Sequence, residues 1–282
     1  MKRDIGDLED VNSPENDCLK NYKEVVEKGI KYINSAPSKW VYITSFDGLK
    51  LAARYFENGS KKTVILFHGY RSNAARDFSC AVKMYLNFGF NVLLCDQRSH
   101  GRSEGKLITF GVKESRDAVS WCRFVLEKYS AEKIVLGGMS MGATTVLLAL
   151  KQQLHDEVTA IVADSGFTSP VDIILKVSRD VFKINAKFFM PFLNFFCIIF
   201  GKFSLYKANT VDAVKNSEIP ILFIHGKSDT FVPCEMSGLA FANATEKSKI
   251  VLIEDAEHGM GFLVDTVSVK SALSQFLSYY AN

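Results

Sequence analysis

Three residues of this sequence are of the types that carry out nucleophilic acyl transfer. Ser140 is the central residue of the pentapeptide 138–142, Gly-Met-Ser-Met-Gly, which fits the pattern Gly-x-Ser-x-Gly. A serine hydroxyl is a poor nucleophile near neutral pH, so a histidine must take its proton and return it to the leaving group. His258 is the candidate base, and Asp229 is the candidate acid that holds the imidazole in the right tautomer.

Other acids and histidines compete for these roles. Asp164 also follows an apolar run, and Glu254 and Asp255 lie just before His258, but position in the chain favours Asp229. His68 and His100 are more simply explained by hydrogen bonds to loop backbone. His225, inside the end of a strand, is likewise expected to be structural, and His155 to be exposed to solvent. No spacing such as His-x-x-x-His indicates a metal site. We therefore expect neither a metal nor a cofactor.

The segment around Ser140 has the composition of a strand, a sharp turn and a helix. Residues 134–136 are an apolar run typical of a buried strand, and residues 143–150 are small or apolar, which suits a helix. Such a turn strains the backbone of the serine, and glycine at positions 138 and 142 allows the strand and the helix to approach closely. The Met141 N–H at the start of the helix is then placed to bind a developing oxyanion.

The elements around this segment alternate along the chain. Residues 40–46 and 49–56 flank Asp47-Gly48 and predict a hairpin. Further apolar runs that predict buried strands are 63–67, 91–95, 158–163, 220–224 and 249–253, and helices are predicted over 74–88, within 109–129, within 231–244 and over 266–279. Such alternation predicts an α/β fold with a mostly parallel sheet of about eight strands and helices on both faces. Residues 140, 229 and 258 all follow strand ends, so they converge at one edge of the sheet.

Two segments stand outside this alternation. Residues 1–39 form a predicted N-terminal extension, in which residues 15–34 have the apolar spacing of an amphipathic helix. The stretch 166–207 is longer than an ordinary link between a strand and a helix. The predicted core therefore consists of residues 40–165 and 208–282.

The order serine, acid, histidine is that of the α/β-hydrolase family, which the sequence resembles over roughly residues 41–279. Four more segments resemble motifs of that family: 68–69 (His-Gly), 96–103 (Asp-Gln-Arg-Ser-His-Gly-Arg-Ser), 224–229 and 256–259. The chain is most similar to bacterial cytosolic members described as serine aminopeptidase-like or lysophospholipase-like. The resemblance implies an α/β-hydrolase fold and an oxyanion hole formed by the N–H groups of Tyr70 and Met141.

The same resemblance implies that residues 166–207 form a helical cap, inserted after the sixth strand and lying over Ser140. This segment is rich in phenylalanine. The rings could form the small core of the cap itself, line a pocket for an acyl chain, or contact lipid; the residues assigned to such a substrate pocket are Phe188, Phe189, Phe192, Phe196 and Phe200. The run is too short to span a membrane, so no stable membrane insertion is expected.

Composition excludes several classes of protein. The net charge of +3 over 282 residues is too small to argue for a nucleic-acid partner. The N-terminus lacks the apolar core of a signal peptide, so we expect a cytoplasmic protein. The cysteines are scattered without a Cys-x-x-Cys pair and are expected to be free thiols: Cys18, Cys80, Cys95, Cys122, Cys197 and Cys234.

These observations predict a carboxylesterase-like serine hydrolase that cleaves a small-molecule ester or acyl substrate through an acyl-enzyme intermediate. An aminopeptidase or amidase would need an acid near the cap to bind an α-amino group, and Asp172 and Asp180 are the candidates. Acyl transfer to another acceptor would use the same triad. A catalytically silent binding protein is the alternative of a different class. Apolar cap surface left exposed would favour a homodimer or a moving lid.

Overall fold

The computed structural model of this chain describes residues 21–281. The N-terminal helix is seen as α1, Lys23–Ser35, and the part of the predicted helix before residue 21 lies outside the described residues. Val26 and Ile33 are its buried residues and lie seven positions apart, which places them on one face of the helix. The helix therefore packs one apolar face on the body, as its spacing predicts.

Eight strands form one sheet in the order β1-β2-β4-β3-β5-β6-β7-β8. The hairpin β1–β2 is antiparallel, β2 is antiparallel to β4, and all other neighbours are parallel. This confirms the prediction of a mostly parallel sheet of about eight strands. The strands are β1 Lys39–Thr44, β2 Lys50–Phe56, β3 Lys62–Phe67, β4 Asn91–Asp96, β5 Lys133–Met139, β6 Val158–Asp164, β7 Ile221–Gly226 and β8 Lys249–Ile253.

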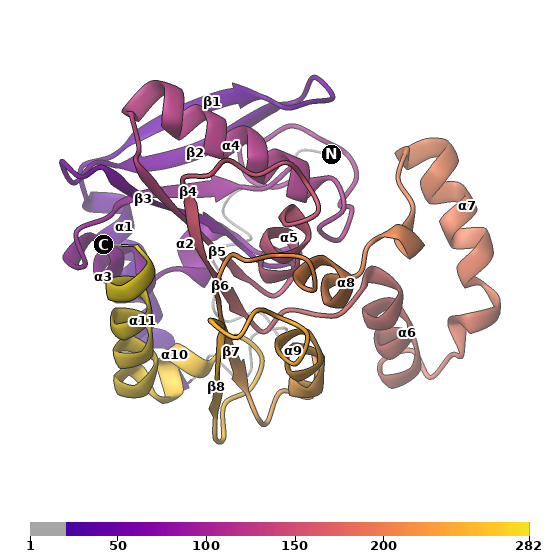
Figure 1. Cartoon of the computed structure of the whole chain (residues 1–282). Coiled ribbons are helices and arrows are strands. Elements are labelled where there is room, and N and C mark those ends of the chain that lie inside the picture. The colour runs from indigo at the N-terminus through magenta and orange to yellow at the C-terminus, as the bar shows by residue number, and fades with distance from the viewer. Residues whose placement is uncertain (1–20, 282) are drawn as a thin grey trace.

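Helices cover both faces of the sheet, as predicted (Figure 1). Side chains of α1, α2, α3 and α11 are buried against one face, and those of α4, α5 and α9 against the other. The bounds are α2 Ala74–Asp77, α3 Ala81–Asn87, α4 Glu114–Tyr129, α5 Met141–Ala149, α9 Cys234–Phe241, α10 Gly261–Val264 and α11 Thr266–Tyr280.

The helix predicted over 74–88 is divided in the structure into α2 and α3. At the break the chain meets α1, because a Cβ atom added to Gly29 would lie only 2.3 Å from the carbonyl oxygen of Ser79. Phe78 at the break is buried in the core beneath, so a tertiary contact outweighs the local preference for one helix.

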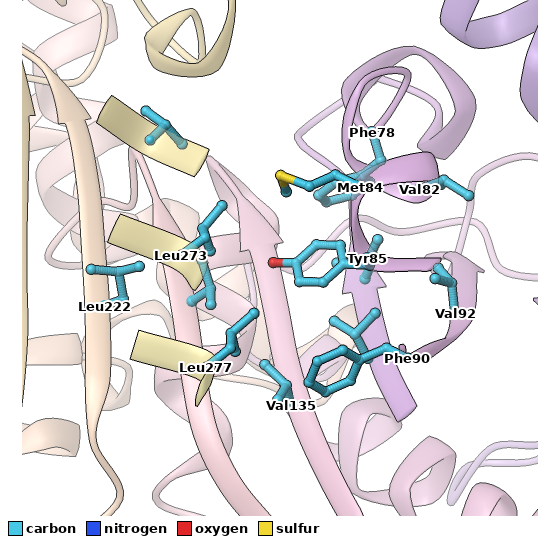
Figure 2. Close-up of a cluster of buried hydrophobic side chains, with 14 of the residues drawn as sticks. Phe78, Val82, Met84, Tyr85, Phe90, Val92, Val135, Leu222, Leu273 and Leu277 are labelled. Carbon is cyan, nitrogen blue, oxygen red and sulfur yellow. The ribbon is translucent and has the colours of Figure 1, made fainter. Parts of the chain in front are cut away.

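The core between α3, α11 and the sheet is apolar (Figure 2). Figure 2 shows Tyr85 of α3 reaching toward the side where Leu273 and Leu277 of α11 lie, with Val135 of β5 beneath. All four side chains are at most 3% exposed. The cluster packs on β5, the strand that leads to Ser140, through Val135.

The insertion after the sixth strand is helical. It contains α6 Pro170–Asp180, the 3₁₀ turns η3 Ala186–Phe188 and η4 Leu205–Lys207, and α7 Met190–Gly201. The short helix α8 Thr210–Val214 follows the insertion, and its Val214 is buried in the core. The Ser169 side chain accepts the Asp172 N–H at the start of α6, and Pro170 follows in the first turn, so this helix begins with two favoured residues. Figure 1 shows α6 and α7 projecting to one side of the sheet. None of the helices between residues 21 and 281 combines the length and the apolar character that crossing a bilayer would require.

Candidate active site

Ser140 occupies a strained turn between β5 and α5. Its φ and ψ angles are 54° and −117°, a backbone conformation that residues other than glycine rarely adopt. A Cβ atom on Gly138 would lie 2.2 Å from the backbone of Gly142, and one on Gly142 would lie 1.8 Å from the carbonyl oxygen of Phe67. Only glycine fits at these two positions, as the pattern of the pentapeptide predicts. The turn therefore presents the Ser140 hydroxyl at the C-terminal edge of the sheet.

The structure brings the three predicted residues into one hydrogen-bonded chain. Nε2 of His258 lies 2.8 Å from Oγ of Ser140, and Nδ1 of His258 lies 2.6 Å from Oδ2 of Asp229. Asp229 follows β7 and His258 follows β8, so parallel strands bring their carboxyl ends to the same edge. In this arrangement His258 can accept the proton of Ser140 while Asp229 accepts the other imidazole N–H.

Asp229 is held as an anion although it is only 5% exposed. Burial opposes its ionisation, but hydrogen bonds from His225 and His258 outweigh burial and lower the pKa of Asp229 to about 2. Its other oxygen accepts the backbone N–H groups of Phe231 and Val232 at 3.0 and 2.8 Å. The carboxylate is therefore fixed on both oxygens before any substrate binds.

His225 is a residue of the site whose role was not predicted from the sequence. Its Nε2 lies 3.1 Å from Oδ2 of Asp229 and 2.8 Å from the carbonyl oxygen of Val232, and its Nδ1 lies 2.7 Å from Oγ of Ser237. The carbonyl oxygen of Val232 can only accept a hydrogen bond, so Nε2 carries an N–H. The available signal was the spacing of four residues between His225 and Asp229 at the end of a strand.

The loop after β3 runs beside Ser140. A Cβ atom on Gly69 would lie 3.4 Å from Cβ of Ser140, so the next peptide, that of Tyr70, is close to the hydroxyl. Asp77 of α2 accepts the Gly69 N–H at 2.7 Å and the Ser72 hydroxyl, which ties both ends of the loop to one carboxylate. The Ser140 N–H itself is engaged by the carbonyl oxygen of Asp164 at 2.8 Å.

Two buried histidines hold this loop, as expected from the sequence. Nε2 of His68 accepts the Gln97 N–H at 3.1 Å, and Nε2 of His100 accepts the Arg71 N–H at 3.1 Å. Burial lowers the pKa of His68 to about 3, with a further contribution from the neighbouring His100. Each imidazole must be neutral to accept these hydrogen bonds. Because His100 belongs to the segment 96–103, this segment supports the loop after β3.

A cavity of about 660 Å³ contains the three residues in its lining. At its mouth it is lined by Val177 of α6 and by Val181 and Phe182, which directly follow that helix. A larger groove of about 1780 Å³ lies along the segment 98–109 and has none of the three in its lining. The smaller cavity is therefore the candidate substrate site.

The prediction that five phenylalanines line this pocket is wrong for the cavity around Ser140. The lining contains none of Phe188, Phe189, Phe192, Phe196 and Phe200. These side chains are 53–75% exposed, so they do not form a core of the insertion either.

The phenylalanines of α7 are exposed because the helix packs on the protein through its other face. Met190, Asn194, Cys197 and Gly201, at helical spacing, are its better buried positions. The Asn194 side chain accepts the Leu205 N–H at 2.8 Å, which orients the helix. The phenylalanines occupy the other positions and point outward.

The remaining candidates have structural partners. Asp172 accepts the hydroxyls of Thr168 and Ser169, and Asp180 is paired with Lys176 and Arg179. Neither acid lines the cavity around Ser140.

The acids that compete with Asp229 do not reach His258 by a hydrogen bond of this structure. Asp164 accepts the Ser165 hydroxyl at 2.9 Å, and Glu254 pairs with Lys227. Asp255 is exposed, and His155 is half-buried rather than exposed as expected. Among residues 21–281, no group of three or more histidine, cysteine, aspartate and glutamate side chains could hold a metal ion.

The sequence of this chain is similar to those of several known proteins. A family model described as "Serine aminopeptidase, S33" matches residues 58–194. The chain is 24% identical over 216 residues to the uncharacterized protein YqkD of Bacillus subtilis, covering 76% of this chain and 70% of that protein. It is 23% identical over 261 residues to a bifunctional esterase/perhydrolase of Acinetobacter calcoaceticus, covering 78% of this chain and 93% of that protein.

Solved structures agree with the sequence relatives. The esterase Pf2001 of Pyrococcus furiosus superposes with a TM-score of 0.72 and 28% identity, over 88% of this chain and 94% of that one. DcsB, solved with a substrate analogue, superposes with a TM-score of 0.70 at 20% identity, which bears on the fold alone. With its sheet order, its strained serine turn and these matches, the chain has the α/β-hydrolase fold.

Proposed function

We propose that this protein is a serine hydrolase that cleaves carboxylic esters. The observation that carries the proposal is the chain of contacts from Ser140 Oγ through His258 to Asp229, at 2.8 and 2.6 Å. Oγ of Ser140 attacks the ester carbonyl carbon while His258 takes its proton, and the alcohol leaves with that proton as the C–O bond breaks. Water then gives a proton to His258 and attacks the acyl carbon, the acid departs, and Ser140 regains its proton.

The oxyanion is proposed to be stabilised by two backbone N–H groups. Met141 is the first residue of α5, and the first N–H groups of a helix have no partner within it. Tyr70 follows Gly69, whose position beside Ser140 supports its N–H as the second donor. One such donor typically contributes about 3–4 kcal/mol to stabilising the transition state.

Ester cleavage is favoured over the aminopeptidase alternative by the partners of the two acids. An aminopeptidase needs a carboxylate that faces the α-amino group of the substrate, whereas Asp172 and Asp180 are engaged by neighbouring side chains and lie outside the cavity lining. The Acinetobacter protein and the Pyrococcus protein to which this chain is similar are both described as esterases, which supports the same choice. Acyl transfer would use the same residues with another acceptor.

The test is hydrolysis of p-nitrophenyl esters from acetate to palmitate by wild type and by Ser140→Ala. We expect turnover by wild type and none above background by the variant, which should keep the melting temperature of the wild type within a few degrees. Aminoacyl p-nitroanilides and added alcohols distinguish the peptidase and transferase alternatives. Turnover that persists in pure Ser140→Ala would refute the proposal.

A further inference from the structure

The outward face of α7 is made of large apolar side chains. Opposite the side that packs on the protein lie Phe192, Phe195, Phe196 and Ile199, at spacings of three, four and seven residues that place them on one face of a helix. These side chains are 53–59% exposed. Figure 1 shows α7 at the outer edge of the molecule, away from the sheet. The helix is therefore apolar on the side where a surface helix is normally polar.

Contacts between rings join these side chains to their neighbours. The ring centroid of Phe196 lies 5.8 Å from that of Phe195 and 6.0 Å from that of Phe200, and the ring of Phe192 lies 6.4 Å from that of Phe188 in η3. We call the exposed apolar side chains of residues 181–200 the α7 patch. Contiguous apolar surface of this kind marks an interaction site more often than scattered exposed residues do.

The charges around the α7 patch indicate what kind of surface it fits. Residues 181–207 contain four lysines and no acidic residue: Lys183, Lys187, Lys202 and Lys207. All four lysines are exposed, and Lys187 and Lys202 flank α7 at its two ends. Apolar and aromatic side chains bordered by lysines are typical of segments that lie on the surface of an anionic membrane.

A second copy of this chain matches the α7 patch less well than such a membrane does. Two-fold symmetry places the same surface on both sides of an interface between copies. The lysines of residues 181–207 would then face those of the second copy, and this segment has no carboxylate to offset their repulsion. Anionic lipid offers apolar chains to the rings and negative headgroups to the lysines.

The length and the packing of α7 suit a helix that lies in the plane of a membrane surface. Its 12 residues span about 18 Å, whereas the hydrocarbon core of a bilayer is about 30 Å thick. The opposite face of the helix is held by the protein, where the Asn194 side chain accepts the Leu205 N–H at 2.8 Å. Because the helix is formed before it meets a membrane, binding does not have to order it.

We propose that the α7 patch binds reversibly to the surface of membranes that contain anionic lipid. The rings of α7 enter the boundary between headgroups and acyl chains, and the flanking Lys187 and Lys202 lie against the headgroups. Each lysine near the surface strengthens binding by about fivefold. This inference is independent of the proposed ester hydrolysis, because membrane binding is measured without turnover.

The first test is cosedimentation of the full-length protein with vesicles of phosphatidylcholine that contain about 30 mol% phosphatidylserine, in about 0.1 M salt. We expect wild type to bind, and the triple change of Phe192, Phe196 and Phe200 to serine to lower the partition coefficient at least ~tenfold. The matched control makes the same kind of change at three exposed apolar side chains of α9 and α11, which should leave binding within about twofold of wild type: Leu239→Ser, Val267→Ser and Tyr279→Ser.

The second test removes charge and leaves the rings in place. Lys187→Gln combined with Lys202→Gln should weaken binding to these vesicles by about 25-fold. Lys128→Gln combined with Lys270→Gln makes the same change in net charge on α4 and α11, at two other exposed lysines, and should weaken binding by less than about twofold. Raising the salt to about 0.5 M should bring the two double variants together, because salt screens the lysines.

The inference is overturned if wild type does not bind the phosphatidylserine vesicles, or if each patch variant binds as well as its control. Sedimentation velocity distinguishes the other occupant. A wild-type dimer that the triple serine variant dissociates, together with no vesicle binding, would assign the α7 patch to a second copy. Should the serine variant lose its fold, the two lysine pairs decide the question by themselves.

Discussion

Ser140 combines a strained backbone with a reactive position. Its φ of 54° is maintained because the glycines around it allow β3, β5 and α5 to pack without intervening side chains. Replacement by alanine removes the hydroxyl without adding atoms. We expect Ser140→Ala to lose at least ~10⁴-fold in kcat. Single-turnover assays and thermal unfolding measured on the same sample check that chemistry, rather than folding, is lost.

Asp229 has a proposed catalytic role and also bears on stability at acid pH. Its pKa is lowered to about 2 in the folded protein, so its contribution to stability is present above the unfolded pKa near 3.8 and is lost as the pH falls toward 2. The size is on the order of 2 kcal/mol. We expect Asp229→Asn to lose ~10⁴-fold in kcat at neutral pH.

The free-energy difference between wild type and Asp229→Asn should also shrink between pH 5 and pH 2. Urea unfolding at several pH values measures it. A difference that stays constant over that range would show that the carboxylate is not held by its hydrogen bonds.

His225 is a positioning residue, because it touches Asp229 and not the nucleophile. In His225→Phe one donor to the carboxylate is lost, so the pKa of Asp229 should rise and the activity should fall by roughly tenfold. The acid limb of the pH profile of kcat/KM should change, which a purely structural role would not cause. Ser237→Ala serves as the control, since it removes the partner of Nδ1 and leaves the contact with Asp229.

At the scale of elements, Arg98 joins three parts of the fold. The guanidinium donates to Asp117 of α4 at 2.6 Å and to Asp47 of the β1–β2 turn at 3.0 and 3.1 Å. Arg98 is only 2% exposed, so it depends on both carboxylates. The network holds the start of the segment 96–103, whose His100 in turn supports the loop beside Ser140.

We expect Asp117→Ala to lower the free energy of unfolding by ~3–5 kcal/mol, because it leaves a buried cation with one partner fewer. Glu57→Ala is the matched control: the Lys39 and Glu57 side chains of its ion pair are 50% and 63% exposed, and its loss should cost less than ~1 kcal/mol. Denaturant unfolding of the two variants should separate these values. Equal losses would contradict the network.

At the scale of the whole molecule, α7 is unusual because its outward positions are apolar. Phe192, Phe196 and Phe200 are 59%, 53% and 73% exposed, and isolated exposed rings are common whereas a continuous set is not. Polar replacement of exposed side chains should cost little. We expect the triple variant to serine to keep its melting temperature within about 3 °C, to bind less of the dye ANS and to retain acetate hydrolysis. A large drop in melting temperature would mean that these rings are buried in solution.

Much of this protein was predictable from sequence alone. The serine turn depends on neighbours within five residues, and strands and helices are specified by apolar spacing that is local in the chain. Because parallel strands carry their ends to one edge, Ser140, Asp229 and His258 could be placed together without coordinates. The hydrogen bonds of His225 to Asp229 and Ser237 could not be predicted, since they depend on how the end of β7 and α9 lie relative to one another in space.

Tertiary structure alone decided where the apolar residues of the insertion go and where a substrate has room. Composition cannot distinguish a phenylalanine that lines a pocket from one that faces outward, because burial depends on which face of α7 meets the body, and Asn194 and Gly201 determine that face. The cavity at Ser140 is likewise lined by residues such as Tyr70, Val177 and His258, which come from different segments and are far apart in sequence. Local sequence patterns therefore determined which residues gather at the C-terminal edge of the sheet. Packing between elements that are distant in sequence determined the shape of the cavity beside them.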